Sequence, residues 1–211
     1  MSANVLDLNE IKRAQTDYPI HELLQKRWSP RAYVAQPVET EKLLSLLEAA
    51  RWAASGGNLQ PWSFIIATQQ DQPEAFARLV GCLFDGNVAW AAKAPVLGVA
   101  VAKLLRDPGK PNRHAFHDVG LALQNLVIQA TALDLYVHMM GGFSHEKVRE
   151  AFAIPEDHEA VTMFSIGYLG DPETLPETVR ARELGQRIRR PLSEFVFTER
   201  WGETAPLVAK V

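Results

Sequence analysis

The chain has 211 residues, of which 47% are hydrophobic and 22% charged, a balance that excludes wholesale disorder and fits one large globular domain. The formal net charge of −3 gives no general basis for binding nucleic acid or a membrane surface. The single cysteine, Cys82, excludes an internal disulfide, and no apolar run approaches the roughly 20 residues of a membrane span. Because the N-terminal stretch also lacks a signal-peptide pattern, we expect a cytoplasmic protein.

The first half of the chain predicts two helices, a strand and a third helix. The first helix runs from about Pro19 to Arg27, and Ser29-Pro30 ends it because the residue before a proline avoids helical geometry. The stretch VETEKLLSLLEAARWAAS has apolar residues at helical period and predicts a strong helix. It runs into the breaker SGGNLQPW, after which residues 62–68 predict a strand and residues 73–83 a helix.

The rest of the body predicts three strands and two helices, one of them buried. The apolar run at 94–102 is typical of a strand buried on both faces, and a polar loop follows it. Residues 116–133 are apolar nearly all round, which is typical of a helix buried on every side by a sheet and a partner subunit. Residues 136–140 and 160–170 predict strands, with a helix near 144–152 between them. This order predicts a sandwich of helices around one sheet.

The tail from Asp171 to Val211 has no long apolar period, and residues 180–200 carry six Arg and three Glu. It is either a solvated charged surface or an arm that wraps a neighbour and brings arginines to an anionic site.

Common catalytic and metal-binding motifs are missing. The sequence has no GxGxxG, GxxxxGK[ST], GxSxG, CxxC or HExxH. His114, His117 and Asp118 have ligand-type side chains, but helical neighbours of this kind are more often surface or capping groups. No acid–base pair stands out either. We therefore expect no metal site and no dedicated catalytic side chain.

Two short stretches have the chemistry of anion and heterocycle binding. In RWSPR, Arg27, Ser29 and Arg31 offer two guanidinium forks and a hydroxyl that suit a phosphate, although such arginines are usually solvated. In SGGNLQPW, the residues Ser55, Asn58 and Gln60 offer donor and acceptor edges that suit a heterocycle or a polyol, although this is also an ordinary turn. The tail adds the pair Arg187 and Arg189.

Together these stretches resemble the flavin-dependent nitroreductase family. Its members have an R-x-S-x-R element, a P-V helix rich in Leu and Ala, and an S-x-x-N-x-Q-P-W turn that leads into a strand, as this chain does from Arg27 onwards. The likeness continues through AAKAPV, HDVGLALQNLVIQATALDL, GYLGDP and RIRRPLSE, over roughly residues 20–195. Two departures are Ala54 in place of the usual proline before the turn, and a short loop at 103–117.

The resemblance implies an α+β sandwich, with a central mostly antiparallel mixed sheet flanked by helices, in an intertwined homodimer that binds FMN at its interface. Residues 1–170 would form the FMN-binding domain. Residues 171–211 would wrap the partner subunit and complete the phosphate site. The implied cofactor contacts are Arg27, Trp28, Ser29 and Arg31 at the phosphate and ribityl end, with Arg187 and Arg189; Ser55, Asn58 and Gln60 on the other side, the first two from the second subunit; and Met140, Gly141 and Gly142 near flavin N5.

The implied activity is ping-pong hydride transfer from NAD(P)H through FMN to nitroaromatic, quinone or similar flat acceptors, with the chemistry on flavin N5. Phe116 or Phe143 would stack on a small aromatic acceptor, although core packing is the favoured role for both. Two alternatives stay open. The first is a flavoprotein of the same fold that reduces free flavin or removes a substituent reductively. The second is a non-enzymatic dimer that uses its basic tail to bind a partner.

Overall fold

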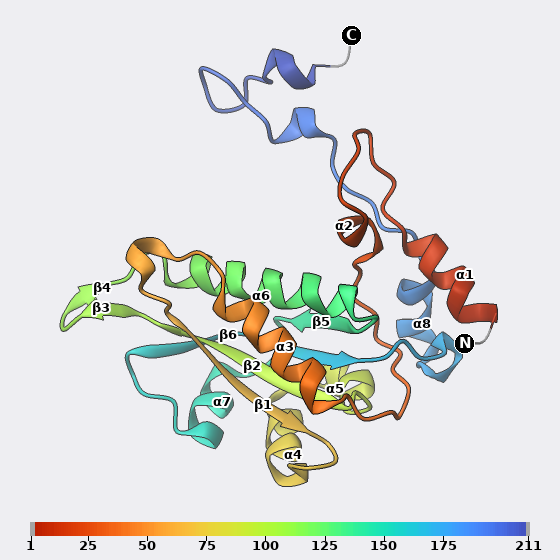
Figure 1. The fold of residues 1–211 in the computed structure, drawn as a ribbon, viewed down its shortest axis with the longest axis vertical. Helices are drawn as coiled ribbons and strands as arrows, with labels where there is room; N and C mark the ends of the chain where they lie inside the picture. The colour runs from red at the N-terminus through yellow and green to blue at the C-terminus, as the bar shows by residue number, and fades with distance from the viewer. Residues whose placement is uncertain (1–2, 210–211) are drawn as a thin grey trace.

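A four-stranded antiparallel sheet forms the centre of the computed structural model, which describes residues 3–209 (Figure 1). Its strand order is β1 (Trp62–Thr68), β2 (Val96–Lys103), β6 (His158–Gly167) and β5 (Tyr136–Met140). All three pairings are antiparallel. The α+β fold with a mostly antiparallel sheet flanked by helices is therefore confirmed.

Helices cover both faces of this sheet. α3 (Thr40–Arg51) and α6 (Ala115–Ala132) lie on one face, and α4 (Pro73–Cys82), α5 (Asp85–Ala91) and α7 (His145–Phe152) lie on the other (Figure 1). The central strand β2 serves both layers because successive side chains of a strand point to opposite faces. Its residues Leu97, Val99 and Val101 pack in one core, and Val96, Ala100 and Ala102 in the other.

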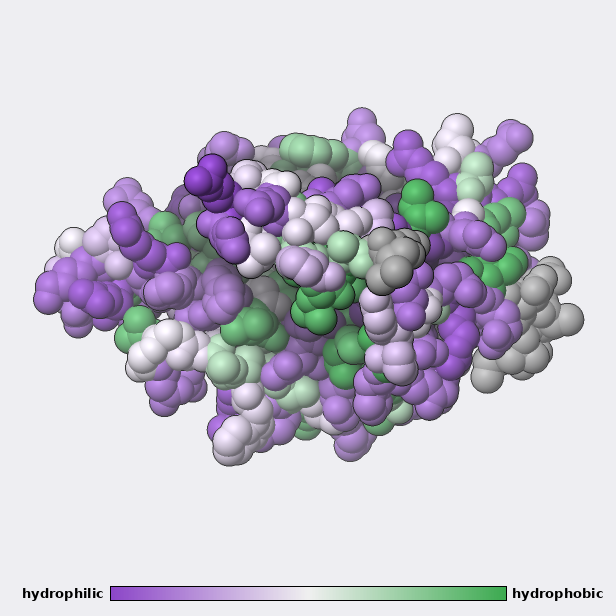
Figure 2. Space-filling model, turned by 90° about the horizontal axis from the view of Figure 1, so that it is seen from above, coloured by the Kyte–Doolittle hydropathy of each residue, from purple (hydrophilic) through white to green (hydrophobic). Residues whose placement is uncertain are grey.

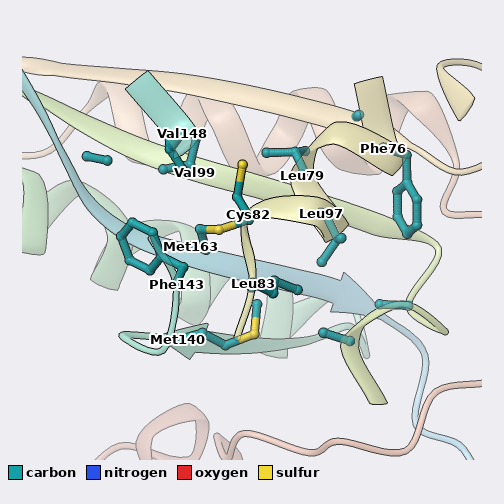
Figure 3. Packing of buried hydrophobic residues seen from close by; sticks show 14 of the residues in the cluster. Phe76, Leu79, Cys82, Leu83, Leu97, Val99, Met140, Phe143, Val148 and Met163 are labelled. Carbon is teal, nitrogen blue, oxygen red and sulfur yellow. The ribbon is translucent and has the colours of Figure 1, made fainter. Parts of the chain in front are cut away.

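The core beneath α4 and α7 is apolar and closely packed. Figure 3 shows Leu79 and Cys82 of α4 near Met163 of β6 and Val148 of α7. Cys82 is 2% exposed, and burial raises the pKa of its thiol. The cysteine is therefore a small core residue, as the apolar sequence around it predicts.

Most of the predicted elements are confirmed, with boundary shifts of one or two residues. The strand at 62–68 matches β1, and the helix at 73–83 matches α4. The first helix is shorter than predicted: α2 spans Glu22–Lys26, because the side chain of His21 accepts from the backbone N–H of Leu23 and caps it there.

Several elements were not predicted from the sequence. α1 (Ala3–Lys12) precedes the first predicted helix, and α8 (Glu177–Leu184) lies in the tail. The polar loop after β2 folds into a hairpin of β3 (Leu105–Asp107) and β4 (Lys110–Pro111). The remaining short 3₁₀ turns are Gly56–Asn58, Pro172–Thr174, Leu192–Glu194 and Pro206–Val208.

The apolar helix is α6, and one chain buries only part of it, so the predicted burial on its other side by a partner subunit stays a prediction. On α6, Val119, Leu123 and Leu126 are buried, but Phe116 and Leu121 are 48% and 37% exposed. One chain covers only the side of α6 that faces the sheet and α3. The opposite side is left uncovered.

The tail leaves the body after α8 and projects away from it (Figure 1). Beyond that helix, Ile188, Trp201 and Leu207 are 83%, 94% and 86% exposed. Over residues 3–209, no helix has the length and hydropathy needed to cross a membrane.

Candidate functional site

The RWSPR segment lies against the start of β5. The side chain of Trp28 is buried, where its indole Nε1 donates to Asn9 Oδ1 at 3.0 Å and its ring meets Tyr136 edge-on at 5.9 Å. The Pro30 carbonyl accepts from Nδ1 of His138 at 2.9 Å. Only the backbone of Trp28 is therefore free to contact a ligand, while Arg27, Ser29 and Arg31 remain partly accessible.

The side chains of this segment make few internal contacts. The guanidinium of Arg27 donates to Ser29 Oγ at 3.1 Å. The guanidinium of Arg31 lies 3.5 Å from a carboxylate oxygen of Glu183 and 5.8 Å from the ring centroid of Trp90. The pKa of Arg27 is lowered because burial disfavours its charge and Arg189 lies nearby. The segment thus presents two cations, and one of them, Arg31, lies beside a carboxylate.

That carboxylate belongs to α8 and ties the tail to the body. Glu183 is 1% exposed, and one of its oxygens accepts from the backbone N–H of Arg31 at 2.7 Å and of Ala32 at 3.2 Å. Charge-assisted bonds to backbone N–H groups are among the stronger hydrogen bonds in proteins. Glu183 therefore holds the arginine segment in place.

Arg187 approaches the same segment from the tail. Its guanidinium donates to the backbone carbonyls of Arg27 and Gln25, the second at 2.7 Å, at the C-terminal end of α2. Its Nε is buried and has no hydrogen-bond partner among the described residues. Burial, followed by the positive charges of Arg27 and Arg189, lowers the pKa of Arg187 to about 10. Partly buried cations often pair with an anion, and Arg187 has no ion pair with the residues whose side chains the structure describes.

Lys12 adds a further positive charge. It is 5% exposed and donates through Nζ to the carbonyls of Arg182 and Gly185, with its ammonium 5.3 Å from the ring centroid of Trp28. Burial lowers its pKa, Glu183 raises it, and Arg31 and Arg187 lower it further. We name Lys12, Arg27, Arg31, Arg187 and Arg189 the cationic cluster. Among residues with described side chains, Glu183 is the one carboxylate that contacts it.

The Gly-rich turn after α3 forms a separate group. The backbone N–H of Gln60 donates to Ser55 Oγ at 3.0 Å, and Gln60 Nε2 donates to the carbonyl of Asn58 at 3.3 Å. Asn58 and Gln60 have φ values of 55° and 46°, in the left-handed region that non-glycine residues rarely adopt. The backbone N–H of Gly56 donates to Asp118 Oδ2 at 3.0 Å, which fixes the turn to the start of α6.

The structure does not bring these two groups together within one chain. The turn lies at the N-terminal end of α6, and the RWSPR segment lies near its C-terminal end (Figure 1). α6 has 18 residues and is therefore about 27 Å long. A single small ligand reaches both groups only if one of them comes from a second chain.

The strand end at Met140–Gly142 forms a third group of predicted cofactor contacts. The Met140 side chain is in the core, and its carbonyl accepts from Thr162 Oγ1 at 2.9 Å. The Gly142 carbonyl accepts from Asn87 Nδ2 at 3.0 Å, and a Cβ on Gly142 would lie 2.7 Å from that nitrogen. Because Gly142 has no side chain, the amide of Asn87 can approach its backbone closely. Gly141 is exposed.

Phe143 and Phe116 differ in their surroundings. Phe143 is 2% exposed and stacks on the ring of His145 at 4.4 Å, so core packing is confirmed for it. Phe116 is 48% exposed on α6, so the core role expected for it is wrong within one chain.

The histidine–aspartate pair has a structural use. His117 Nδ1 lies 2.9 Å from Asp118 Oδ1, and the other oxygen of Asp118 accepts from Gly56. Among the described residues, no group of three or more His, Cys, Asp or Glu side chains is arranged to hold a metal ion.

Sequence reasoning missed Lys12, His138 and Glu183. Nothing near Lys12 or His138 marks them as parts of a site. Glu183 stands in RARELG, where it is indistinguishable from the charges of a solvated helix. Their roles depend on contacts 100 or more residues apart in the chain, such as the 108-residue separation of His138 and Pro30.

Comparison with known proteins identifies the family. The sequence pattern described as the nitroreductase family matches residues 24–168. The chain belongs to the nitroreductase family. A solved structure described as an oxidoreductase containing FMN is similar to this nitroreductase-family chain, with a TM-score of 0.83 and 34% identity over 90% of this chain and 96% of the other.

Two further relatives of this nitroreductase-family chain extend the comparison. A nitroreductase family protein from Clostridium difficile superimposes with a TM-score of 0.66 and 28% identity, covering 84% of this chain and 96% of that one. An Archaeoglobus fulgidus protein named "Putative NADH dehydrogenase/NAD(P)H nitroreductase" is 26% identical over 159 residues, which are 74% of this chain and 88% of its own. These matches support a flavin oxidoreductase.

Proposed function

We propose that the protein is an FMN-dependent oxidoreductase that carries hydride from NAD(P)H to nitroaromatic, quinone or similar flat acceptors in a ping-pong cycle. The observation that carries this proposal is the cationic cluster, which has five basic side chains, one contacting carboxylate among the described residues, and the unpartnered Nε of Arg187. Such a surplus of partly buried positive charge suits a bound phosphate. The FMN named for the similar solved structure carries a phosphate of this kind.

The residues fit the phosphate end of FMN in a definite way. Arg27, Ser29, Arg31 and Arg189 would bind the phosphate and ribityl chain directly, with the backbone of Trp28. Arg187 donates two of its nitrogens to carbonyls of the segment, so it would orient Arg27 and offer Nε toward the anion. FMN itself supplies the chemistry of accepting and donating hydride.

The other half of the site would come from a second copy of the chain. Ser55, Asn58 and Gln60 lie too far from the cationic cluster to share a ligand with it in one chain, and α6 leaves one side uncovered. In a homodimer, that side of α6 would be buried, and the tail of residues 171–211 would wrap the partner. The backbone at Met140, Gly141 and Gly142 would lie near the reactive ring, where the absence of side chains on the glycines gives access.

The NAD(P)H donor is supported by the printed name of the archaeal relative. Few side chains would act directly, because the protein's task is to bind, orient and exclude water. The cytoplasmic location also stays a prediction.

The deciding experiment is the visible absorption spectrum of the purified protein, recorded before and after NADH or NADPH is added without oxygen. We expect a yellow protein that bleaches. A colourless protein that takes up no added FMN would contradict the proposal and favour the non-enzymatic dimer. If the flavin bleaches, turnover of a nitro compound supports the proposed acceptors, whereas release of reduced FMN or loss of a substituent favours the alternative flavoproteins.

A further inference from the structure

A hollow of about 500 Å³ lies between the hairpin of β3 and β4 and the Gly-rich turn after α3. Its lining includes Gly56, Arg106, Asn112, Arg113 and His114. Figure 2 shows hydrophilic side chains gathered over the hairpin, at the left end of the molecule. The volume lies within the range of small-molecule sites.

The lining of this hollow is basic, and nearby carboxylates are occupied. The side chain of Arg113 makes no ion pair or hydrogen bond with the described residues. Asp107 lies 4.0 Å from Arg106 and 3.7 Å from Lys110, so it is shared between two cations. The carboxylate of Asp118 is hydrogen-bonded to the backbone N–H of Gly56 and to the ring of His117. The hollow therefore has two exposed guanidinium groups: Arg106 shares Asp107 with Lys110, and Arg113 has no carboxylate partner among the residues with described side chains.

The backbone of this lining is held in place, although the arginine side chains are exposed. The backbone N–H of Asn112 donates to the Leu104 carbonyl at 2.7 Å, which joins the end of the hairpin to the end of β2. Asn112 Oδ1 accepts from the backbone N–H of His114 at 3.1 Å. The ring of His114 lies so close to Gly56 that a Cβ there would be 3.3 Å from its Cδ2. The arginine side chains thus extend from a backbone that hydrogen bonds hold in place beside the Gly-rich turn.

We propose that this hollow binds the 2′-phosphate of NADPH and so makes NADPH the preferred donor over NADH. The inference rests on the proposed function, because it assigns the donor of the same reaction. A 2′-phosphate is a compact anion that two guanidinium forks recognise well, and NADH has a neutral hydroxyl at that position. In the proposed reaction, hydride would leave the nicotinamide with both of its electrons, forming NADP⁺, and FMN would accept it.

The first experiment measures binding without the redox step. Titration calorimetry on the full-length protein uses adenosine 2′,5′-bisphosphate as the probe and adenosine 5′-monophosphate as its matched control. We expect the bisphosphate to bind more tightly, and the Arg113→Gln and Arg106→Gln variants each to lose about tenfold in affinity for it alone, as expected for a lost charge-assisted contact. Arg78→Gln, an exposed arginine on α4, serves as the control variant and should change nothing.

The second experiment measures flavin reduction without oxygen and without acceptor, using NADPH and NADH in turn. We expect Arg113→Gln to slow reduction by NADPH at low concentration by about tenfold and to leave NADH unaffected. An unchanged ratio of the NADPH to the NADH reduction rate in Arg113→Gln would overturn the inference. If the protein binds no FMN, the proposed function fails. The calorimetry then still decides whether the hollow binds a 2′-phosphate, and equal binding of the two nucleotides would overturn that.

Discussion

The guanidinium of Arg187 donates to the backbone carbonyl of Arg27, which lies 160 residues earlier in the chain. A second nitrogen of the same group donates to the Gln25 carbonyl, so one side chain of the tail spans the end of α2. These carbonyls are the acceptors that a helix leaves unsatisfied at its C-terminal end. The contact therefore links the basic tail to the segment that would hold a phosphate.

Replacing Arg187 tests this link. In Arg187→Ala, the Arg27 carbonyl loses its donor, the Gln25 carbonyl keeps only the backbone N–H of Ala14, and the cluster loses one charge. We therefore expect FMN to bind more weakly by about 1.5 to 3 kcal/mol. Arg187→Lys keeps the charge but lacks the planar guanidinium that donates to two carbonyls at once, so it should recover only part of that loss. Fluorescence titration of the apoprotein with FMN gives both values. Arg200→Ala, an exposed arginine in the same tail, is the control. Equal affinities for Arg187→Ala and Arg200→Ala would remove Arg187 from the site.

Arg31 is expected to contact the phosphate directly. Arg31→Ala should weaken FMN binding by about 1.5 to 3 kcal/mol, the range for a charge-assisted hydrogen bond. Its guanidinium lies 3.5 Å from Glu183, so part of any effect could arise from folding. Urea unfolding of the apoprotein measures that part separately. Unchanged flavin affinity would exclude Arg31 from the phosphate site.

Glu183 is expected to matter for stability more than for flavin chemistry. In Glu183→Gln, the carboxylate that accepts from the backbone of Arg31 and Ala32 becomes a neutral amide, so the free energy of unfolding should fall by about 2 kcal/mol. Glu173→Gln breaks an exposed ion pair with Arg180 and should change it by less than about 0.5 kcal/mol. Urea unfolding at one pH compares the two variants. Equal losses in the free energy of unfolding would show that the buried Glu183 stabilises the fold no more than an exposed ion pair does.

His138 predicts a pH dependence of stability. Burial, followed by the charges of Arg31 and Arg27, lowers its pKa to about 4 from its ordinary value of 6.5. The unfolded chain therefore takes up the proton first as the pH falls, and stability that is present above pH 6.5 is lost toward pH 4. Between about pH 7 and pH 5, this group should lower the free energy of unfolding by about 2 kcal/mol.

The variant His138→Gln isolates this contribution, because an amide donates to the Pro30 carbonyl without titrating. Unfolding by urea is measured at both pH values for the two proteins. The decrease should be smaller in His138→Gln by about the amount given above. An identical decrease in both proteins would mean that other groups cause it.

The end of the tail provides a separate test of the proposed dimer. Removing residues 191–211 leaves Glu183 and Arg187 in place, whereas a cut at residue 180 would remove both. The segment carries the exposed side chains of Trp201 and Leu207, so its loss should weaken self-association without unfolding the body. Sedimentation velocity and circular dichroism measure the two effects. Unchanged association would argue against a wrapping arm and leave residues 191–209 a solvated surface.

Local sequence patterns were enough to predict the framework of this protein. The alternation and apolar runs of residues 62–68 and 94–102 predict strands that the structure confirms with small shifts, because side-chain period depends only on local geometry. RWSPR and SGGNLQPW also identified the family, since their residue types and spacing are local features.

Tertiary contacts decided which side chains are buried and which are exposed, because local patterns do not determine this. Whether Glu183 is a solvated charge or a buried acceptor depends on Arg31, which lies 152 residues away. Whether Trp28 offers its ring or only its backbone depends on Asn9 and Tyr136. The apolar character of α6 indicates burial, but it does not say what covers each side. The free energy of burying a charge or a ring comes from neighbours that only the folded chain brings together, and no short window of sequence contains them.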